Sequence, residues 1–347
     1  MPDIKPTDLS VLVVEGFINV NGESKIRLSK SKNLSDSSIY EPVLNAAMLI
    51  ESDGSESYPL LGTASGEYIS FNNQLSTDRK YRLKISVNGK QYESEFVQPL
   101  LTPPIEEVAW KQDNGIVKID VSTRSENPDL RYYLWNYTET WEILSKYEAY
   151  YKYNGEFVEP RDPQEVRNMY QCWNNEESSR ILTASSVNNQ TNVVANFPLT
   201  EIIPYDQKLS VRYSILVRQF SIPRKAFDFY ELIKKNTEST GSIFGPLPSE
   251  VSGNIKCITN PNELVIGFIS ASTQQEKRIF ISSTEVGWNF QYNCSEIYIP
   301  NHPDSMKAFY PVYTPYRMKG RNEGYFSAGN NCMDCRLYGS SIRPTFW

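Results

Sequence analysis

Four dipeptides that favour tight turns constrain the fold of this chain more than any other feature. Asn21-Gly22, Asp53-Gly54, Asn88-Gly89 and Asn154-Gly155 each lie between strand-like flanks. A two-residue hairpin turn requires positive φ at its centre, which Asn, Asp and Gly adopt at the lowest cost. The flanks of Asn88-Gly89, LKISV and KQYESEF, also alternate apolar and polar residues as a half-buried strand does. The pattern predicts a β protein built from hairpins.

Prolines that follow the first hundred residues mark the predicted domain boundary. Between about Leu9 and Val97, roughly seven strand-like segments have the spacing of an immunoglobulin-like β-sandwich. The segment QPLLTPPIEE follows, and its prolines fix φ and remove backbone donors. We therefore predict a mainly β protein with an immunoglobulin-like β-sandwich over residues 1–100. A larger β-rich domain over residues 105–347 is expected to carry one or two helices and long C-terminal loops.

Patterns within the larger domain place two helices and several strands. The segment DPQEVRNM begins with Asp162 as N-cap and Pro163 at the first helical position. Apolar residues recur at helical spacing from Ala226 to Ile233, and Gly241 is expected to end this helix. Alternation predicts strands in GIVKIDVST, KLSVRYSILVRQFSI, ELVIGFISAS and KRIFISS. The last third is rich in Pro, Asn and Gly, which predicts long loops.

Charge and motif content argue against several functional classes. With 35 Lys and Arg against 41 Asp and Glu, the formal net charge is −6, and no basic stripe suits a nucleic-acid partner. No apolar stretch approaches the roughly 20 residues of a membrane-spanning helix. Phosphate-binding and calcium-binding loop patterns are absent. The one histidine, His302, lies in a loop beside Pro303, where a solvated structural role is favoured over catalysis. We expect no enzyme, no cofactor and no metal.

Acidic residues form no recognisable catalytic pair in the sequence. Glu106-Glu107 and Glu176-Glu177 are adjacent, so the two side chains of each pair point to opposite faces of a strand. We interpret them as solvated charges rather than as the paired carboxylates of a glycosidase. A hydrolase that uses acidic residues at an unrecognised spacing remains the weakest functional alternative.

Five cysteines raise three alternatives for the C-terminal part. They are Cys172, Cys257, Cys294, Cys332 and Cys335, so at least one stays free or pairs between chains. The last two form a C-x-x-C pair, which suits a disulfide framework, half a zinc site or a redox motif. We favour a structural disulfide that joins Cys294 to one member of the pair. A zinc site and unpaired thiols remain open.

Aromatic residues are dense between Tyr132 and Tyr153. On a strand, Tyr133, Trp135 and Tyr137 share one face, and Tyr132, Leu134 and Asn136 share the other. Our favoured interpretation is that one row fills the core and the other lies at a half-buried edge. If a row is exposed, it could stack on sugar rings or anchor a protein partner. The candidate binding residues under that hypothesis are Trp135, Tyr137 and Trp141.

Several sequence blocks, in this order, resemble one protein family over nearly the whole chain. It is the Bacteroidetes outer-membrane lipoprotein family catalogued as domain of unknown function 4249. The blocks are VVEG at 13–16, ETW ending at 141, YSILVRQFSI at 213–222, GSIFGPLPS at 241–249, Gly253-Asn254, VIGFISAS at 265–272, RIFIS at 278–282, Cys332 with Cys335, and RPTFW at 343–347.

The resemblance implies a function that the residues alone do not indicate. It implies a lipoprotein of the outer membrane, held at the cell surface or facing the periplasm by a lipidated cysteine that precedes Met1. Members are often encoded beside SusC-like TonB-dependent transporters, so we expect an accessory or binding partner of such a transporter in substrate uptake. An oxidising location also favours disulfides. The family implies no catalytic residues. The alternative is a structural or adhesion protein at the cell surface without a transporter partner.

Overall fold

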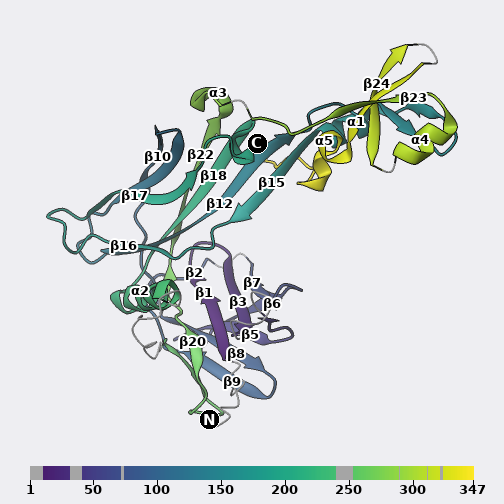
Figure 1. The fold of residues 1–347 in the computed structure, drawn as a ribbon. Coiled ribbons are helices and arrows are strands. Elements are labelled where there is room, and N and C mark those ends of the chain that lie inside the picture. Colours follow the sequence, from purple (N-terminus) through teal and green to yellow (C-terminus); the bar gives the residue numbers. More distant parts are fainter. Residues whose placement is uncertain are drawn as a thin grey trace, which may run out of the picture.

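The computed structural model describes residues 11–31, 41–71, 74–239, 253–288, 290–310, 312–320 and 323–347. The fold is mainly β, as predicted, and has three parts that Figure 1 shows in turn from the N-terminus. A first sandwich lies nearest the N-terminus, a second and larger pair of sheets follows, and an arm extends from that pair. The helices are few and lie at the edges of these parts.

Strand β6 joins the two sheets of the first sandwich. Leu60 of β6 lies opposite Met48 of β5, and Gly62 of β6 lies opposite Tyr68 of β7. Strand β6 therefore passes from one sheet into the other. Alternate residues of these strands are buried in one core, as the period of two predicts. The strands are β1 (Leu12–Gly16), β2 (Ile18–Asn19), β3 (Ser24–Lys30), β4 (Glu41–Pro42), β5 (Ala47–Ser52), β6 (Ser57–Gly62), β7 (Glu67–Ser70), β8 (Tyr81–Val87) and β9 (Lys90–Ser94).

A segment from late in the chain completes the first sandwich. Strand β19 (Ile255–Cys257) pairs with β9, β20 (Val265–Gly267) runs parallel to β1, and β21 (Ala271–Ser272) runs parallel to β2. The prediction assigned all these residues to the domain over 105–347. The first sandwich therefore draws on residues beyond the predicted boundary, because strand alternation shows that a strand forms but not which distant strand it pairs with.

Close backbone contact fixes this returning segment, and a methyl group there is expected to disrupt it. A Cβ atom at Gly253 would lie 1.6 Å from the carbonyl oxygen of Gly267. We expect Gly253→Ala to lower the free energy of unfolding by about 2–3 kcal/mol, since two backbones would have to separate. Urea denaturation measures this. The control is Gly54→Ala, whose Cβ would meet only the Arg79 side chain and should cost less than about 0.5 kcal/mol. Equal stability of the two variants would contradict the pairing.

The turn predictions are confirmed in part. Asn88 and Gly89 have φ of 51° and 74°, as a primed two-residue turn between β8 and β9 requires. Gly155 also has positive φ, whereas at Asp53-Gly54 the positive φ falls on the next residue, Ser55. Asn21-Gly22 takes no positive φ, so a primed turn there is wrong. A further pair, Asn114-Gly115, forms a hairpin that the sequence analysis did not include.

The second sandwich packs a three-stranded sheet on a five-stranded sheet around an apolar core of its own. The three-stranded sheet consists of β10 (Ile105–Asp113), β11 (Ile116–Arg124) and β17 (Val193–Ile202). The five-stranded sheet consists of β12 (Tyr132–Leu144), β15 (Gln171–Glu177), β16 (Leu182–Ser185), β18 (Arg212–Ser221) and β22 (Gln274–Ser282). Short helices η1 (Gln207–Leu209) and α3 (Ser283–Val286) lie beside it, and the predicted helix α2 (Arg224–Ser239) packs on β12 and β16. Its predicted stop, Gly241, lies outside the described residues.

The arm corrects the prediction that the last third forms long loops. Strands β23 (Glu296–Pro300), β24 (Tyr313–Gly320) and β25 (Gly324–Gly329) form an antiparallel sheet, accompanied by the hairpin β13 (Tyr151–Tyr153) and β14 (Val158–Pro160). Helices α4 (Pro303–Phe309), α5 (Asn330–Met333) and η2 (Cys335–Leu337) complete it. Helix α1 (Pro163–Tyr170) begins as predicted, because Asp162 accepts hydrogen bonds from two backbone amides of its first turn.

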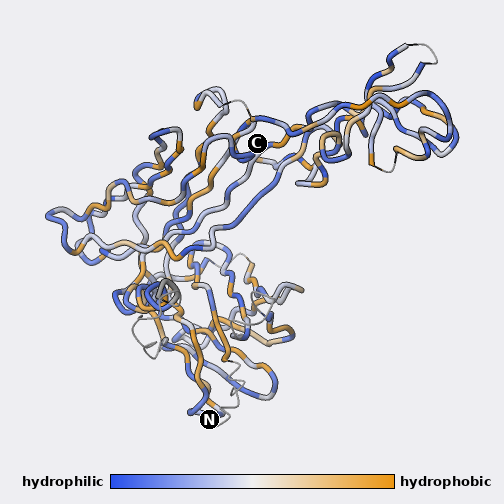
Figure 2. Tube along the Cα trace, viewed as in Figure 1, coloured by the Kyte–Doolittle hydropathy of each residue, from blue (hydrophilic) through white to orange (hydrophobic). Residues whose placement is uncertain are grey.

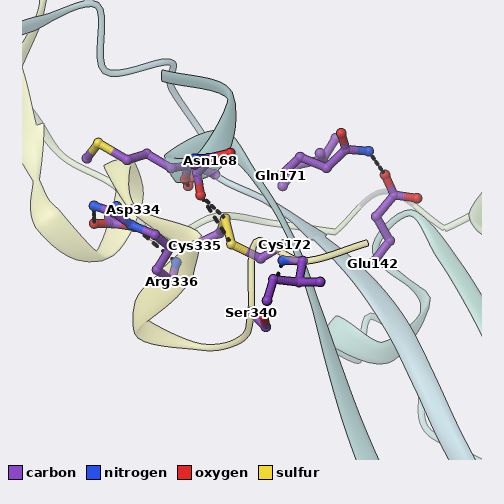
Figure 3. The surroundings of a disulfide bond; sticks show 12 residues. Glu142, Asn168, Gln171, Cys172, Asp334, Cys335, Arg336 and Ser340 are labelled. Carbon is purple, nitrogen blue, oxygen red and sulfur yellow. Dashed lines mark hydrogen bonds and ion pairs between the residues drawn. A yellow bond between two sulfur atoms is a disulfide. The ribbon is translucent and has the colours of Figure 1, made fainter. Parts of the chain in front are cut away.

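Two disulfides hold the base of the arm. Cys294 pairs with Cys332, which confirms the favoured prediction, and Cys172 pairs with Cys335. The C-x-x-C pair is thus divided between two bonds. Figure 3 shows the second bond, which links β15 to η2 beside Asn168 of α1. Cys257 is free and buried in the first sandwich.

Candidate functional site

The aromatic residues proposed as binding anchors lie inside the second core. Trp135, Tyr137 and Trp141 are 1%, 5% and 7% exposed. The ring of Trp135 stacks on Phe197 of the opposite sheet, with 4.9 Å between centroids. This burial corrects their nomination as surface residues, because they fill the space between the sheets. The opposite row is half-buried, as the favoured interpretation expected.

A polar network at the edge of the same core includes Glu139, the most deeply buried carboxylate of β12. Lys208 Nζ lies 2.8 Å from Glu139 Oε2 and 2.7 Å from Glu176 Oε2. Tyr213 donates a hydrogen bond of 2.8 Å to Glu139 Oε1. Although burial opposes it, bonding to the two carboxylates holds the pKa of Lys208 above its ordinary value. Each group has a partner within the protein, so we interpret the network as structural.

A cleft of about 890 Å³ lies between the first sandwich and the outer face of the five-stranded sheet. Its floor includes Leu134 and Asn136 of β12 with Arg218 of β18, and its wall includes residues from β1 and β3. The Oδ1 atom of Asn136 is buried and, within the described part of the chain, accepts no hydrogen bond. A buried acceptor of this kind normally has a donor, so its position beside the cleft marks a polar point of the floor. The volume falls in the range of small-molecule sites.

The chain passes between the two sandwiches near Leu100 and near Ser272. Contacts of these two segments and one aromatic contact set the geometry of this cleft. Backbone hydrogen bonds of 3.0 Å join Leu100 to Ala271 and to Thr273, so the two crossing segments run side by side. Thr102 Oγ1 then accepts a 2.9 Å hydrogen bond from the backbone of Ser221 on β18. The ring of Phe17 contacts that of Phe220, with centroids 4.0 Å apart. These contacts hold the two sandwiches in a defined relation.

Acidic groups outnumber basic ones around the cleft. Glu67 pairs with Arg27 at 2.7 Å, and Arg218 lies 3.6 Å from Glu177 and 3.3 Å from Glu276. Glu15 and Glu23 also line the cleft. Glu176 and Glu177 point to opposite faces of β15, as their adjacency predicted, and only Glu177 faces this cleft.

A second cavity of about 410 Å³ lies beneath the tail, which we define as residues 338–347. Both cavities are lined by Glu177 and Arg218, and we refer to the two neighbouring cavities together as the groove. Strand β15, hydrophilic along most of its length in Figure 2, forms one side of it. The tail is held to this strand by two backbone hydrogen bonds of 2.8 Å between Trp173 and Ser340. The disulfide from Cys172 to Cys335 lies beside the same strand (Figure 3).

Two arginines line the second cavity, Arg218 of β18 and Arg278 of β22. Arg278 donates a 3.0 Å hydrogen bond to Ser214 Oγ, and its guanidinium lies 3.5 Å from the ring centroid of Phe346. Burial, aided by the charge of Arg218, holds the pKa of Arg278 below its ordinary value. Neither arginine was predicted from the sequence to be a site residue. Both arginines lie in predicted strands. The alternation of polar and apolar residues in these strands indicates that each arginine faces away from the core, but not that the two lie close together.

The remaining predicted residues lie away from the groove. His302 is exposed, and its ring nitrogen caps α4 by accepting from the Asp304 amide, which agrees with a structural role. Among the described residues, no group of three or more His, Cys, Asp or Glu could hold a metal ion. No helix in that part of the chain is both long and apolar enough to cross a membrane.

Comparisons with known proteins identify a family of unknown function. A family model described as a domain of unknown function (DUF4249) matches residues 1–278. Two C-terminal blocks of the resemblance, Cys332 with Cys335 and RPTFW, lie beyond this match, as does all but the first residue of RIFIS. The comparison with curated proteins gives no match.

Two solved structures match this chain at low identity and with low TM-scores. A two-domain fibronectin type III segment of chicken tenascin is 8% identical, with a TM-score of 0.18, and the match covers 60% of this chain and 89% of that one. A DUF4785 family protein of Legionella pneumophila is 10% identical, with a TM-score of 0.19. That match covers 59% of this chain and 51%, about half, of the Legionella protein.

Proposed function

The chain belongs to the DUF4249 family, and on this premise we propose that it is a non-enzymatic outer-membrane lipoprotein. It acts as the accessory or binding partner of a SusC-like TonB-dependent transporter in substrate uptake. The groove beside the five-stranded sheet receives the ligand, and an N-terminal lipid anchor holds the protein at the membrane, with the groove facing the cell exterior.

The observation that carries the binding part of this proposal is the groove itself. It lies at the junction of two sandwiches, where ligand sites commonly form, and it combines convergent polar groups with apolar walls. The backbone pairing of Leu100 with residues 271 and 273 preforms it, which lowers the entropic cost of binding.

Two further observations support the location and the absence of catalysis. Disulfides that join Cys172 to Cys335 and Cys294 to Cys332 persist in oxidising compartments outside the cytoplasm. The groove presents carboxylates such as Glu177 and Glu276 that are already paired with Arg218. A carboxylate that is already engaged by an arginine directs its oxygens to that partner rather than to a reacting group.

Recovery of the partner from the native envelope tests this function. The full-length lipidated protein is isolated in mild detergent, and the proteins bound to it are identified and quantified by mass spectrometry. We expect a TonB-dependent transporter in near-equal amount, and its transport substrate then becomes the ligand to test. The control is a known transporter complex that survives the same detergent. Recovery of this protein alone would contradict the proposal and favour a structural or adhesion role.

A further inference from the structure

We propose that the cavity beneath the tail binds a small organic anion, with a carboxylate held by Arg278 and Arg218 and an apolar or aromatic body held by the tail. This deepens the proposed function by naming a ligand class for the groove. It is tested on the isolated protein, so the partner experiment and the binding experiment can fail independently.

The first argument is that Arg278 forms no ion pair within the described part of the chain. Among the residues that the structure describes, no carboxylate forms an ion pair with its guanidinium, whose contacts are Ser214 Oγ and the Phe346 ring; Glu276 attracts it only from a longer distance. Arg218 lies close enough to disfavour a second positive charge. Partly buried charges are normally paired, because removal from water is costly. A bound anion between the two arginines supplies the missing charge and relieves their repulsion.

The second argument is the chemistry available to an anion at this place. A guanidinium presents several N–H donors in one plane, which fits the two oxygens of a carboxylate. Arg218 donates one bond to Thr138 Oγ1 at 2.8 Å, while its ion pairs with Glu177 and Glu276 are longer, at 3.6 and 3.3 Å. Both partner carboxylates are substantially exposed, so they can turn into solvent when a ligand carboxylate enters.

The third argument concerns the body of the ligand. Leu216 of the sheet and Ile342, Pro344 and Phe346 of the tail also line the cavity. The Phe346 ring and the apolar side chains offer surfaces to a hydrocarbon or aromatic group, whose burial is favourable. A volume of about 410 Å³ suits a small molecule. An amphipathic carboxylate therefore fits better than inorganic phosphate, which would leave the apolar wall in water.

Isothermal titration calorimetry on the purified, disulfide-intact protein provides the test. The probes are phenylacetate, its neutral analogue phenylacetamide, and inorganic phosphate. We expect phenylacetate to bind with a dissociation constant of about 1 mM or lower, at least about tenfold more tightly than phenylacetamide. Equal binding of the acid and the amide would overturn the role of the arginines. Binding of phosphate without phenylacetate, or of no probe at about 1 mM, would overturn the ligand class.

Opposite charges introduced at one exposed, neutral position of the cavity give a matched pair of variants. Ile342 is 79% exposed, so Ile342→Asp and Ile342→Lys leave the core untouched. We expect phenylacetate to bind at least about fivefold more weakly to the Asp variant than to the Lys variant, since the new charge repels or attracts the anion. Equal affinities would contradict binding beneath the tail.

A substitution of the cation itself completes the test. Arg278→Gln should weaken phenylacetate binding by at least about tenfold and leave phenylacetamide unaffected. The matched control is Arg317→Gln in the arm, which removes an arginine stacked on Phe326 outside the groove and should change neither affinity. Unchanged phenylacetate binding by Arg278→Gln would overturn the proposal. If that variant does not fold, the Ile342 pair decides.

Discussion

Replacing Cys172 and Cys335 together with alanine is expected to lower the free energy of unfolding by roughly 5 kcal/mol. The bond closes a loop across a sequence separation of 163 residues, so its loss releases a large conformational entropy in the unfolded chain. Replacing Cys294 and Cys332, which are 38 residues apart, should cost roughly 1 kcal/mol less by the same argument. Urea denaturation of the two double variants measures the difference.

The single variant Cys257→Ala is the control for this comparison. Its thiol is free and buried, so the substitution should cost only about 1 kcal/mol, from lost packing. A larger loss from the Cys294–Cys332 pair than from the Cys172–Cys335 pair would contradict the entropic account. Peptide mapping without reduction checks the pairing directly. Because the Cys172–Cys335 disulfide anchors η2, from which the tail emerges, its loss should also weaken phenylacetate binding.

The second large effect is expected from Trp135→Ala, at about 4 kcal/mol or more. The side chain is 1% exposed, and its truncation leaves a cavity between the sheets. Its indole N–H donates a 2.8 Å hydrogen bond to Gln219 Oε1. Gln219 in turn donates to the Pro103 carbonyl at 2.8 Å and to Thr123 Oγ1 at 2.9 Å. The substitution therefore disturbs a buried network that ties the proline connector to the second sandwich.

Trp135→Phe separates the two contributions. It retains most of the volume but leaves Gln219 Oε1 without its donor, at an expected cost of about 1–3 kcal/mol. Leu134→Ala, on the half-buried face of the same strand, should cost less than Trp135→Ala. A Trp135→Ala protein as stable as wild type would contradict the buried position and restore this residue as a surface anchor.

Turns, helix caps and the two faces of a strand were predicted correctly where they depend only on neighbouring residues in the sequence. Asn88-Gly89 adopts the predicted turn because only the turn dipeptide and its flanks matter there. Asp162 caps α1 for the same reason. Alternation also separated the two faces of β12 correctly. It could not show which face is covered, because that depends on strands β10, β11 and β17 packing against it.

Non-local contacts account for what the sequence did not predict. The parallel pairing of β1 with β20 joins segments some 250 residues apart, and no local pattern names that partner. Strands β23–β25 contain Pro and Gly, which made their segment resemble loops. Arg218 and Arg278 come together because β18 pairs with β22, and the tail then covers them. Neither contact is encoded in the local sequence around either arginine. Cys172 was missed as a partner of Cys335 for the same reason.

Uptake by intact cells tests most directly the claim that the groove serves a transporter. Cells without this protein are complemented with wild type, with Glu23→Trp, which narrows the cleft from an exposed position, or with Glu41→Trp, outside the groove. The uptake rate is measured at a limiting concentration of the substrate of the co-purified transporter. We expect uptake to fall without the protein and to be restored by wild type and Glu41→Trp but not by Glu23→Trp. Unchanged uptake in its absence, or equal restoration by both variants, would contradict the account.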